Sequence, residues 1–600
     1  MRKSLKKLIS EKLIENNPVI VEEMRKHNAI YGHIEDKVRR MKYVASLYWN
    51  YSVLKRNPYE IKIKENRKAI YPESASDSIE KTISKMKTQI DLGDNVIFDV
   101  WDLLLYQSIT EKYVYALLEI QTGDLGIITE IKRNTTINQR QREILETIEI
   151  DFSLDCKIMH SMFEYAQNKG KKVYLYNESK LISDDTCKKI LNRYGYYNFE
   201  LVEDINENGG IYFSKEEWGN ICLKNNIYRP YSNLTFIPQL YNTIVNLRMH
   251  GNVRKFSIFY EYGFNYGGIL TCGFCQFLNG IAKKNGIDKF LFVARDGYII
   301  QKVYNAYFNE IENEYLLYSR FASYELIYEE FPNEYIEKNV KPRIYRKNHD
   351  NSVKKILREL GLTILLDYLK ETELNECDVI TEKNFIYLQQ LLLNNYSLIK
   401  QQFQEAHIAA SQYIMELVGN AKNICIVDLG WHGTSTIYLQ KFIKKYIPEV
   451  KIMGAMIGAL DNDITQMYIM KGTLETYAFS NDRCRDSLKS IPMTYEELLV
   501  HELLFSAPTE TLLHYGIDKK GRQKFTYGLK NENYQIIKDI HQGIQDFARQ
   551  IIPILNKYNL KINSTDAYAP LYQITQNKAY VEVLLKAYYE TDGAINGYEN

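Results

Sequence analysis

The sequence predicts an α/β fold with two parallel-sheet domains, and three observations support this prediction. From about residue 95, short apolar runs of strand length alternate with polar or amphipathic stretches of helix length. A second alternating series begins near Gly263, which indicates a second sheet. In each series an apolar run ends in an acid and is followed by a loop or helix, the order expected when helical crossovers join parallel strands.

Length and composition limit the classes of function. The 600 residues suffice for about three to four domains of ~150 residues. The 76 basic and 75 acidic residues balance, so no overall field attracts nucleic acid. Eight cysteines are scattered, which indicates a reducing compartment, and we expect a cytoplasmic protein. Cys272 and Cys275 have metal or redox spacing, but no partner pair completes a zinc site, so we expect core thiols.

The first residues, MRKSLKKLISEKLIE, do not have the pattern of an export signal. Glu11 and Lys12 interrupt the apolar region that a signal peptide needs, and no run of about 18 apolar residues occurs in the sequence. One helical face carries Leu5, Leu8, Ile9, Leu13 and Ile14. That face suits either an ordinary surface helix or peripheral contact with the inner face of a membrane.

The chain divides into four expected regions: 1–90, 91–255, 256–520 and 521–600. The first and last are expected to be helical. The region 91–255 contains strands at Val96–Val100 and Val173–Tyr176, with a helix over Met162–Gly170. The region 256–520 begins with a helix that ends at Asn285. Its strands are expected at 289–293, 315–318, 424–427 and 452–457, with a charged helical insert over 347–419.

The stretch Asn423–Gln440, NICIVDLGWHGTSTIYLQ, predicts a phosphate-binding loop. An apolar strand ends in Asp428 and is followed by a loop rich in Gly, Thr and Ser that opens a helix. Amides at a helix N-terminus attract anions, and an acid at a strand end can hold ribose hydroxyls or a metal ion. The lysine of a Walker loop is absent, and so is a GxGxxG fingerprint.

The segment Phe98–Leu104 and the stretch Met159–Tyr196 resemble the haloacid-dehalogenase (HAD) superfamily, in which a strand delivers a nucleophilic aspartate. The resemblance places Asp99 at that position and Asp102 close after it. Leu103 stands where the family has Thr, and Asn177 stands where it has Ser or Thr. No acidic pair for Mg²⁺ follows, and Lys215 is only a weak candidate for the family's lysine. We therefore expect a degenerate HAD-like domain.

The loops Ala294–Tyr298 and Asp428–Thr436 together resemble type I phosphoribosyltransferases, which are Rossmann-like. The first loop of that family binds pyrophosphate, and the second binds the ribose and 5-phosphate of phosphoribosyl pyrophosphate (PRPP). The departures are Leu429, which replaces a second acid, and Trp431, which is uncommon in such a loop.

The resemblance gives each residue a role. Arg295 and Arg320 would bind pyrophosphate, beside Asp296, and Gly297 would let the backbone approach it. Asp428 would hold ribose hydroxyls or Mg²⁺. The 5-phosphate would lie against Gly433, Thr434, Ser435 and Thr436. The general base is left open among Glu502, Glu497 and His432; His432 could instead contact phosphate or pack the loop. For Arg295 and Asp296, a local ion pair is the alternative, and a helix-capping acid is the alternative for Asp428.

The order of the two modules resembles bacterial surface-polysaccharide ribofuranosyltransferase-type proteins, which combine a HAD-like domain with a phosphoribosyltransferase-like domain. The resemblance implies transfer of (phospho)ribofuranose from PRPP to a glycan acceptor in capsule or O-antigen assembly, with Mg²⁺ as cofactor and no nucleic-acid partner. Two alternatives remain open. One is a Mg²⁺-dependent HAD phosphohydrolase that uses Asp99 and Asp102, and the other is a non-catalytic scaffold that binds a phosphosugar or nucleotide.

Overall fold

The computed structural model describes residues 79–124, 126–127, 138–179, 182–206, 208–219, 235–345, 351–460, 463–480, 495–528, 533–575 and 577–591, besides Ala45 and Trp49. Most of the expected N-terminal helical region, including the apolar face of residues 5–14, lies outside them. The described chain forms two compact units. Unit I comprises Pro72–Gly273 and Asp539–Gln573, and unit II comprises Phe274–Lys538 and the chain from Ile574 onward.

Unit I contains a four-stranded sheet of order β5-β4-β1-β6, in which all neighbours are parallel. The expected strands are confirmed as β1 (Asn95–Asp99) and β4 (Lys172–Tyr176), and the expected helix is α9 (Lys157–Asn168). The other elements are α5 (Ile79–Leu92), β2 (Leu105–Gln107), α6 (Glu111–Thr122), α8 (Gln139–Asp151), β3 (Ser153–Asp155), α10 (Asp184–Arg193), β5 (Glu200–Val202), β6 (Ile211–Phe213), α11 (Lys215–Trp218), α12 (Phe236–Met249), α13 (Ile258–Glu261), η5 (Tyr262–Gly267), most of α24 (Tyr534–Lys557) and α25 (Ser564–Thr575).

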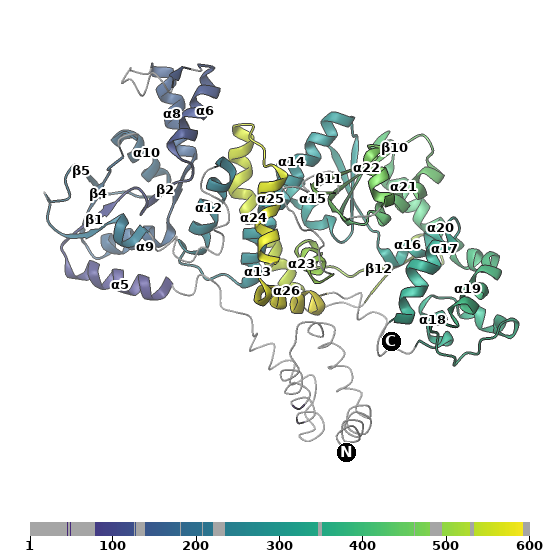
Figure 1. Cartoon of the computed structure of the whole chain (residues 1–600). Coiled ribbons are helices and arrows are strands. Elements are labelled where there is room, and N and C mark those ends of the chain that lie inside the picture. The colour runs from purple at the N-terminus through teal and green to yellow at the C-terminus, as the bar shows by residue number, and fades with distance from the viewer. Residues whose placement is uncertain are drawn as a thin grey trace. The chain divides into compact units, whose positions relative to one another are not determined.

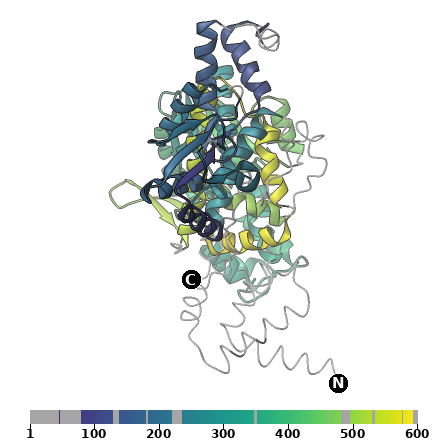
Figure 2. The ribbon, with the colours of Figure 1, turned by 90° about the vertical axis from the view of Figure 1, so that its left-hand side faces the viewer.

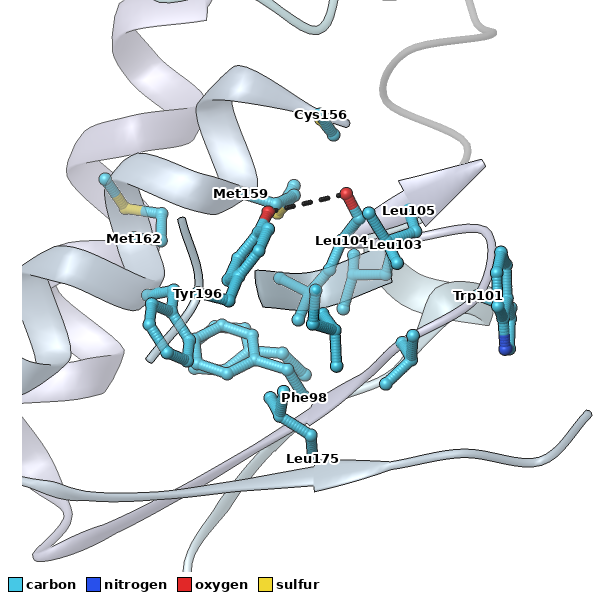
Figure 3. Packing of buried hydrophobic residues seen from close by; sticks show 14 of the residues in the cluster. Phe98, Trp101, Leu103, Leu104, Leu105, Cys156, Met159, Met162, Leu175 and Tyr196 are labelled. Carbon is cyan, nitrogen blue, oxygen red and sulfur yellow. Dashed lines mark hydrogen bonds between the residues drawn. The ribbon is translucent and has the colours of Figure 1, made fainter. Parts of the chain in front are cut away.

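The core of unit I packs aromatic and sulfur-containing side chains against β1. Phe98 is completely buried and stacks on Phe213 of β6, with ring centroids 5.1 Å apart. Tyr196 is also buried, and its hydroxyl donates a 2.7 Å hydrogen bond to Asp155, so its one polar atom is satisfied. In Figure 3, Trp101 stands at the edge of this cluster, away from Tyr196.

Two helices between β1 and β4 in sequence, α6 and α8, pack against each other as a pair. Figure 1 shows them extending away from the sheet that holds β1 and β4. Figure 2 shows the same arrangement from the side. The start of α8 is fixed by a capping box, because Asn138 accepts from the amide of Gln141 and the Gln141 side chain accepts from the amide of Asn138.

Unit II contains a five-stranded sheet of order β11-β10-β9-β7-β8, in which all neighbours are parallel. Helix α14 (Gly268–Asn285) leads into it from unit I. The strands and the helices that follow them are β7 (Lys289–Val293), α15 (Gly297–Tyr307), β8 (Glu312–Leu316), α16 (Arg320–Ile327), β9 (Asn423–Trp431), α21 (Thr434–Tyr446), β10 (Lys451–Ala459), α22 (Asp463–Met470) and β11 (Leu474–Phe479). An α/β fold with two parallel sheets is therefore confirmed.

The strand order of unit II reverses between β7 and β9. In chain order within this sheet the arrangement is 2-1-3-4-5, so the connections leave the neighbouring strands β7 and β9 in opposite directions. In open α/β sheets, ligands bind outside the carboxyl ends of strands at such a switch point. The loops after β7 and β9 are the two that carry the predicted site residues.

Strand β9 is longer than expected. It pairs with β10 as far as Trp431, opposite Ala459, so Asp428 lies within the strand and only His432 and Gly433 separate β9 from α21. The extension depends on glycine at position 430. Its φ is +136°, and an added Cβ would press against the backbone carbonyl of Gly458 on β10.

The long insert between β8 and β9 is helical and has its own apolar core, with Tyr328, Leu357, Leu388 and Phe403 among its members. A buried ion pair joins Arg343 to Glu359 at 2.5 Å. The insert and the remaining elements of unit II are α17 (Pro332–Tyr335), η6 (Ile336–Val340), η7 (Lys341–Tyr345), α18 (Val353–Glu359), η8 (Thr363–Glu371), α19 (Phe385–Asn394), α20 (Tyr396–Val418), α23 (Tyr495–Phe505), the antiparallel hairpin β12 (Leu512–Ile517) and β13 (Gln523–Tyr527), and α26 (Lys578–Thr591).

The cysteine pair and the apolar character of the helices can both be compared with the sequence expectations. Cys272 and Cys275 are both free thiols, and both side chains are fully buried, as expected for core residues. Among the helices of the described segments, none combines the length and the apolar character that crossing a membrane requires.

Replacing Gly430 with Ala is expected to destabilise the β9–β10 pairing. The new Cβ would contact the Gly458 carbonyl and hold a left-handed φ, so we expect a loss of about 2 kcal/mol or more. Thermal unfolding of the full chain measures the effect. The control is Gly280→Ala in α14, where the added methyl group meets no atom, and a change of only about 0.5–1 kcal/mol, in the stabilising direction, is expected. Equal melting temperatures for the two variants would contradict this account.

Candidate functional site

The structure brings the predicted site residues of unit II together at the switch point. Asp296 interacts electrostatically with Asp428, Glu502, Arg295 and Arg320, which come from the ends of β7, β8 and β9 and from α23. Charges interact appreciably only over short distances in water, so these five side chains form one charged group, here called the switch-point cluster.

Asp296 is the most perturbed acid of this cluster. Desolvation by the surrounding protein, then repulsion from Asp428 and Glu502, raises its pKa from the ordinary 3.8 to about 8, and the arginines oppose this only in part. It is the N-cap residue of α15, but its side chain makes no capping hydrogen bond. Among the described residues, its carboxyl forms neither a hydrogen bond nor an ion pair, so the local ion pair with Arg295 is not formed. The side chain stays partly exposed and is open to a ligand.

Asp428 is buried on β9 and is held in place by its neighbours. One oxygen accepts a 2.8 Å hydrogen bond from the amide of Leu429, and the other accepts a 3.1 Å bond from the hydroxyl of Thr436 in the first turn of α21. Burial nevertheless raises its pKa. The residue that caps α21 is Gly433, so Asp428 does not act as a helix cap. Thr436, expected to bind phosphate, is buried and positions this acid.

Glu502 is positioned by two residues that sequence reasoning did not single out for this purpose. Its Oε1 accepts a 3.3 Å hydrogen bond from the indole of Trp431, and its Oε2 accepts a 2.8 Å bond from the hydroxyl of Tyr588. The Trp431 ring is itself fixed between Phe479, with which it stacks, and His501. Tyr588 lies 86 residues from Glu502 in the chain, and no spacing in the sequence signals the contact.

The N-terminus of α21 carries the other predicted phosphate ligands. Gly433 has a left-handed φ of +63° and directs the chain into the helix, and Thr434 and Ser435 are partly exposed in its first turn. His432 is exposed, and its carbonyl accepts from the hydroxyl of Thr465. Desolvation, then the nearby cations Lys338 and Arg320, lowers the pKa of His432. A neutral imidazole here can accept a proton or donate one hydrogen bond.

Arg320 lies at the start of a helix, and Gly297 lies where the chain packs closely against β7. Arg320 is the first residue of α16, directly after the N-cap Ser319, and its exposed side chain interacts electrostatically with Asp296, Asp428 and His432. Gly297 is required for packing, because an added Cβ would lie 2.9 Å from the backbone carbon of Phe292 on β7. Packing alone therefore accounts for a glycine at this position, without a ligand.

The HAD-like residues of unit I form a different arrangement. Asp99 is buried at the end of β1, and its carboxylate accepts a 2.6 Å hydrogen bond from Tyr212 and a 2.7 Å bond from the amide of Lys215. Burial raises its pKa, as it does that of Asp102. The Lys215 ammonium pairs with Glu178. Asn177 accepts a 2.9 Å bond from the indole of Trp101, so its amide has a structural partner.

No group of three or more His, Cys, Asp or Glu side chains in the described segments is arranged to hold a metal ion. Mg²⁺, however, is commonly bound by one or two carboxylates together with substrate phosphates. Asp296, which is partly exposed and would lose its proton on binding a cation, and the buried Asp428 fit that manner of binding.

No known protein-family model matches the chain, and no curated protein matches it.

The raised pKa of Asp296 predicts a pH-dependent stability. The unfolded chain releases this proton near pH 3.8, whereas the folded chain keeps it up to about pH 8. The folded state therefore binds more protons between these values, and its stability falls as the pH rises through this range. Asp296→Asn removes that component, so the variant should gain stability relative to wild type as the pH rises. Melting temperatures measured between about pH 5 and about pH 8.5 test this.

The control for this measurement is Asp367→Asn, which removes a carboxylate from an exposed position in the insert. Its melting temperature should track that of the wild type across the range. If Asp296→Asn did the same, Asp296 would not hold its proton at neutral pH.

Proposed function

We propose that unit II binds PRPP at the switch-point cluster and transfers its ribofuranosyl or phosphoribofuranosyl group to a glycan acceptor in the assembly of a bacterial capsule or O-antigen. The observation that carries this proposal is the gathering of three carboxyls and two arginines between β7 and β9, with the N-terminus of α21 adjoining them. The arginines suit pyrophosphate, and the carboxyls suit ribose hydroxyls.

Each side chain has a task in such a reaction. Arg295 and Arg320 bind the pyrophosphate and stabilise the negative charge that it gains as it leaves. The helix N-terminus at Thr434 and Ser435 receives the 5-phosphate. Asp428, fixed by Leu429 and Thr436, accepts hydrogen bonds from ribose hydroxyls and holds the sugar in one orientation.

Glu502 is the group best placed to act as the general base. Trp431 and Tyr588 hold its two oxygens in one orientation, within electrostatic range of Asp296 and Asp428 in the switch-point cluster. A bond forms between the acceptor oxygen and the anomeric carbon, while the bond from that carbon to pyrophosphate breaks. Glu502 takes the hydroxyl proton, and pyrophosphate leaves with the bonding electrons.

Mg²⁺ would be held by Asp296 and Asp428 together with the donor phosphates, and it would supply positive charge to the leaving pyrophosphate. The raised pKa of Asp296 supports a cationic ligand, since a nearby cation relieves the repulsion among the three carboxyls.

The HAD phosphohydrolase is less well supported. A nucleophilic Asp99 needs to be ionised and needs cations that offset the phosphate charge. Burial raises the pKa of Asp99, and the Lys215 ammonium already pairs with Glu178. A non-catalytic scaffold would bind the same donor as a transferase but would not turn it over. Only an activity measurement therefore distinguishes the two.

Calorimetric titration of the full chain with PRPP and Mg²⁺ tests the proposal. We expect binding at millimolar donor or below. Arg320→Ala should weaken binding about tenfold or more, because it removes a charge-assisted hydrogen bond of about 1.5–3 kcal/mol. Arg358→Ala serves as the control, since this exposed arginine lies on α18 of the insert.

Absence of binding at millimolar PRPP, or equal affinities for the two variants, would overturn the proposal. Pyrophosphate release in the presence of surface-polysaccharide acceptors then distinguishes an enzyme from a scaffold, because a scaffold would bind PRPP without releasing pyrophosphate.

A further inference from the structure

A cavity of about 210 Å³ lies in unit I, apart from the switch-point cluster of unit II. It has room for a group the size of one monosaccharide, far more than a single water needs. Its lining comes from the segment after β1, from helices α6 and α8, and from the loop after β4. The described lining residues are Trp101, Asp102, Gln107, Glu111, Val114, Tyr115, Glu149, Glu178, Ser179 and Ile182.

Glu149 is the unusual member of this lining. Its side chain projects from α8 and is only 4% exposed, yet its carboxyl forms no hydrogen bond or ion pair within the described part of the chain. Burial, then repulsion from Glu146, raises its pKa from 4.5 to about 8. A buried polar group without a partner costs stability, so its presence indicates that something else supplies the partner.

The charges around the cavity indicate the class of ligand. None of the ten described lining residues is Lys or Arg, and the Lys215 ammonium that acts on Asp102 is already paired with Glu178, so a phosphate would find little countercharge. Three of the four acids are already neutralised or engaged. Glu178 pairs with Lys215, Glu111 bonds to Tyr115, and Glu149 keeps its proton at neutral pH. The cavity therefore suits neither a phosphate nor a strongly cationic ligand.

The aromatic lining suits the apolar face of a sugar ring. Trp101 is one of the lining residues, and the 2.9 Å hydrogen bond from its indole to Asn177 fixes its side chain. In Figure 3 this side chain stands at the edge of the core cluster. Tyr115 faces the same space from α6. Rings that offer an apolar face, beside a carboxyl that can both donate and accept, match the alternation of C–H faces and hydroxyls on a carbohydrate.

We propose that this cavity binds one uncharged monosaccharide unit of a glycan, packed against Trp101 and hydrogen-bonded to the side chain of Glu149. Asp102 lines this site, and the chemistry of the lining selects a ligand without phosphate. The inference does not depend on PRPP binding, because all of the lining residues belong to unit I.

Saturation-transfer NMR on the full chain, with a panel of neutral methyl glycosides of ribose, galactose, mannose, glucose and rhamnose, tests the proposal. Ribose 5-phosphate and spermidine are the charged probes. At least one neutral glycoside should show binding that depends on Glu149, whereas neither charged probe should, since ribose 5-phosphate can also bind at the switch-point cluster. Glu149→Ala should weaken that binding about tenfold, since it removes the buried hydrogen-bonding group. Glu149→Gln keeps a neutral group that donates and accepts, and should stay within about threefold of wild type.

Glu143→Ala, an exposed change on the same helix, is the matched control and should leave glycoside binding unchanged. The melting temperature of Glu149→Ala should not fall, because the change removes an unpartnered buried acid. The proposal is overturned if no neutral glycoside binds, if Glu149→Ala weakens the binding of a charged probe as much as that of a neutral glycoside, or if Glu149→Ala binds the glycoside as wild type does. PRPP binding measured on Glu149→Ala should equal that of wild type, so the two proposals fail separately.

Discussion

Three carboxyl groups share one edge of the unit II sheet, and their desolvation, together with their mutual repulsion, is the constraint that the rest of this site accommodates. Asp428 is stabilised by the amide of Leu429 and the hydroxyl of Thr436, and Glu502 by Trp431 and Tyr588. Asp296 has no such partners among the described residues, so it keeps its proton instead. A site with three neighbouring carboxyl groups is suited to a ligand that brings positive charge or hydroxyl donors.

The residues that form the sheet edges could be predicted from local sequence, because each lies directly after or within an apolar strand. The grouping of Asp428 with Arg295 followed from the same logic, since parallel strands present their carboxyl ends at one edge. The length of β9 could not be predicted. It depends on pairing with β10 as far as Ala459, which requires the close approach of Gly430 to Gly458.

Long-range contacts account for the other features that local patterns miss. Tyr588 reaches Glu502 from the last described helix, and Lys338 acts on His432 from the insert. In unit I, Asp539–Gln573 belongs with a sheet that lies more than 300 residues earlier in the chain. None of these pairings leaves a periodic or spaced signal, because tertiary packing alone brings the residues together.

Both units contain a parallel sheet, but the charged side chains at the strand ends differ between them. Both have polar side chains at the carboxyl ends of parallel strands, but unit II supplies arginines there, whereas the Lys215 ammonium of unit I pairs with Glu178. We therefore propose a phosphorylated sugar donor for unit II and an uncharged sugar for unit I. Such a division would let one chain hold a donor and part of a glycan, with the chemistry of transfer confined to unit II.

A crystal structure of the full chain grown with saturating PRPP and Mg²⁺ tests the central claim most directly. The account predicts density for pyrophosphate beside Arg295 and Arg320, and for ribose beside Asp428. Donor density at another place in the chain, or an empty switch-point cluster at saturating donor, would contradict it.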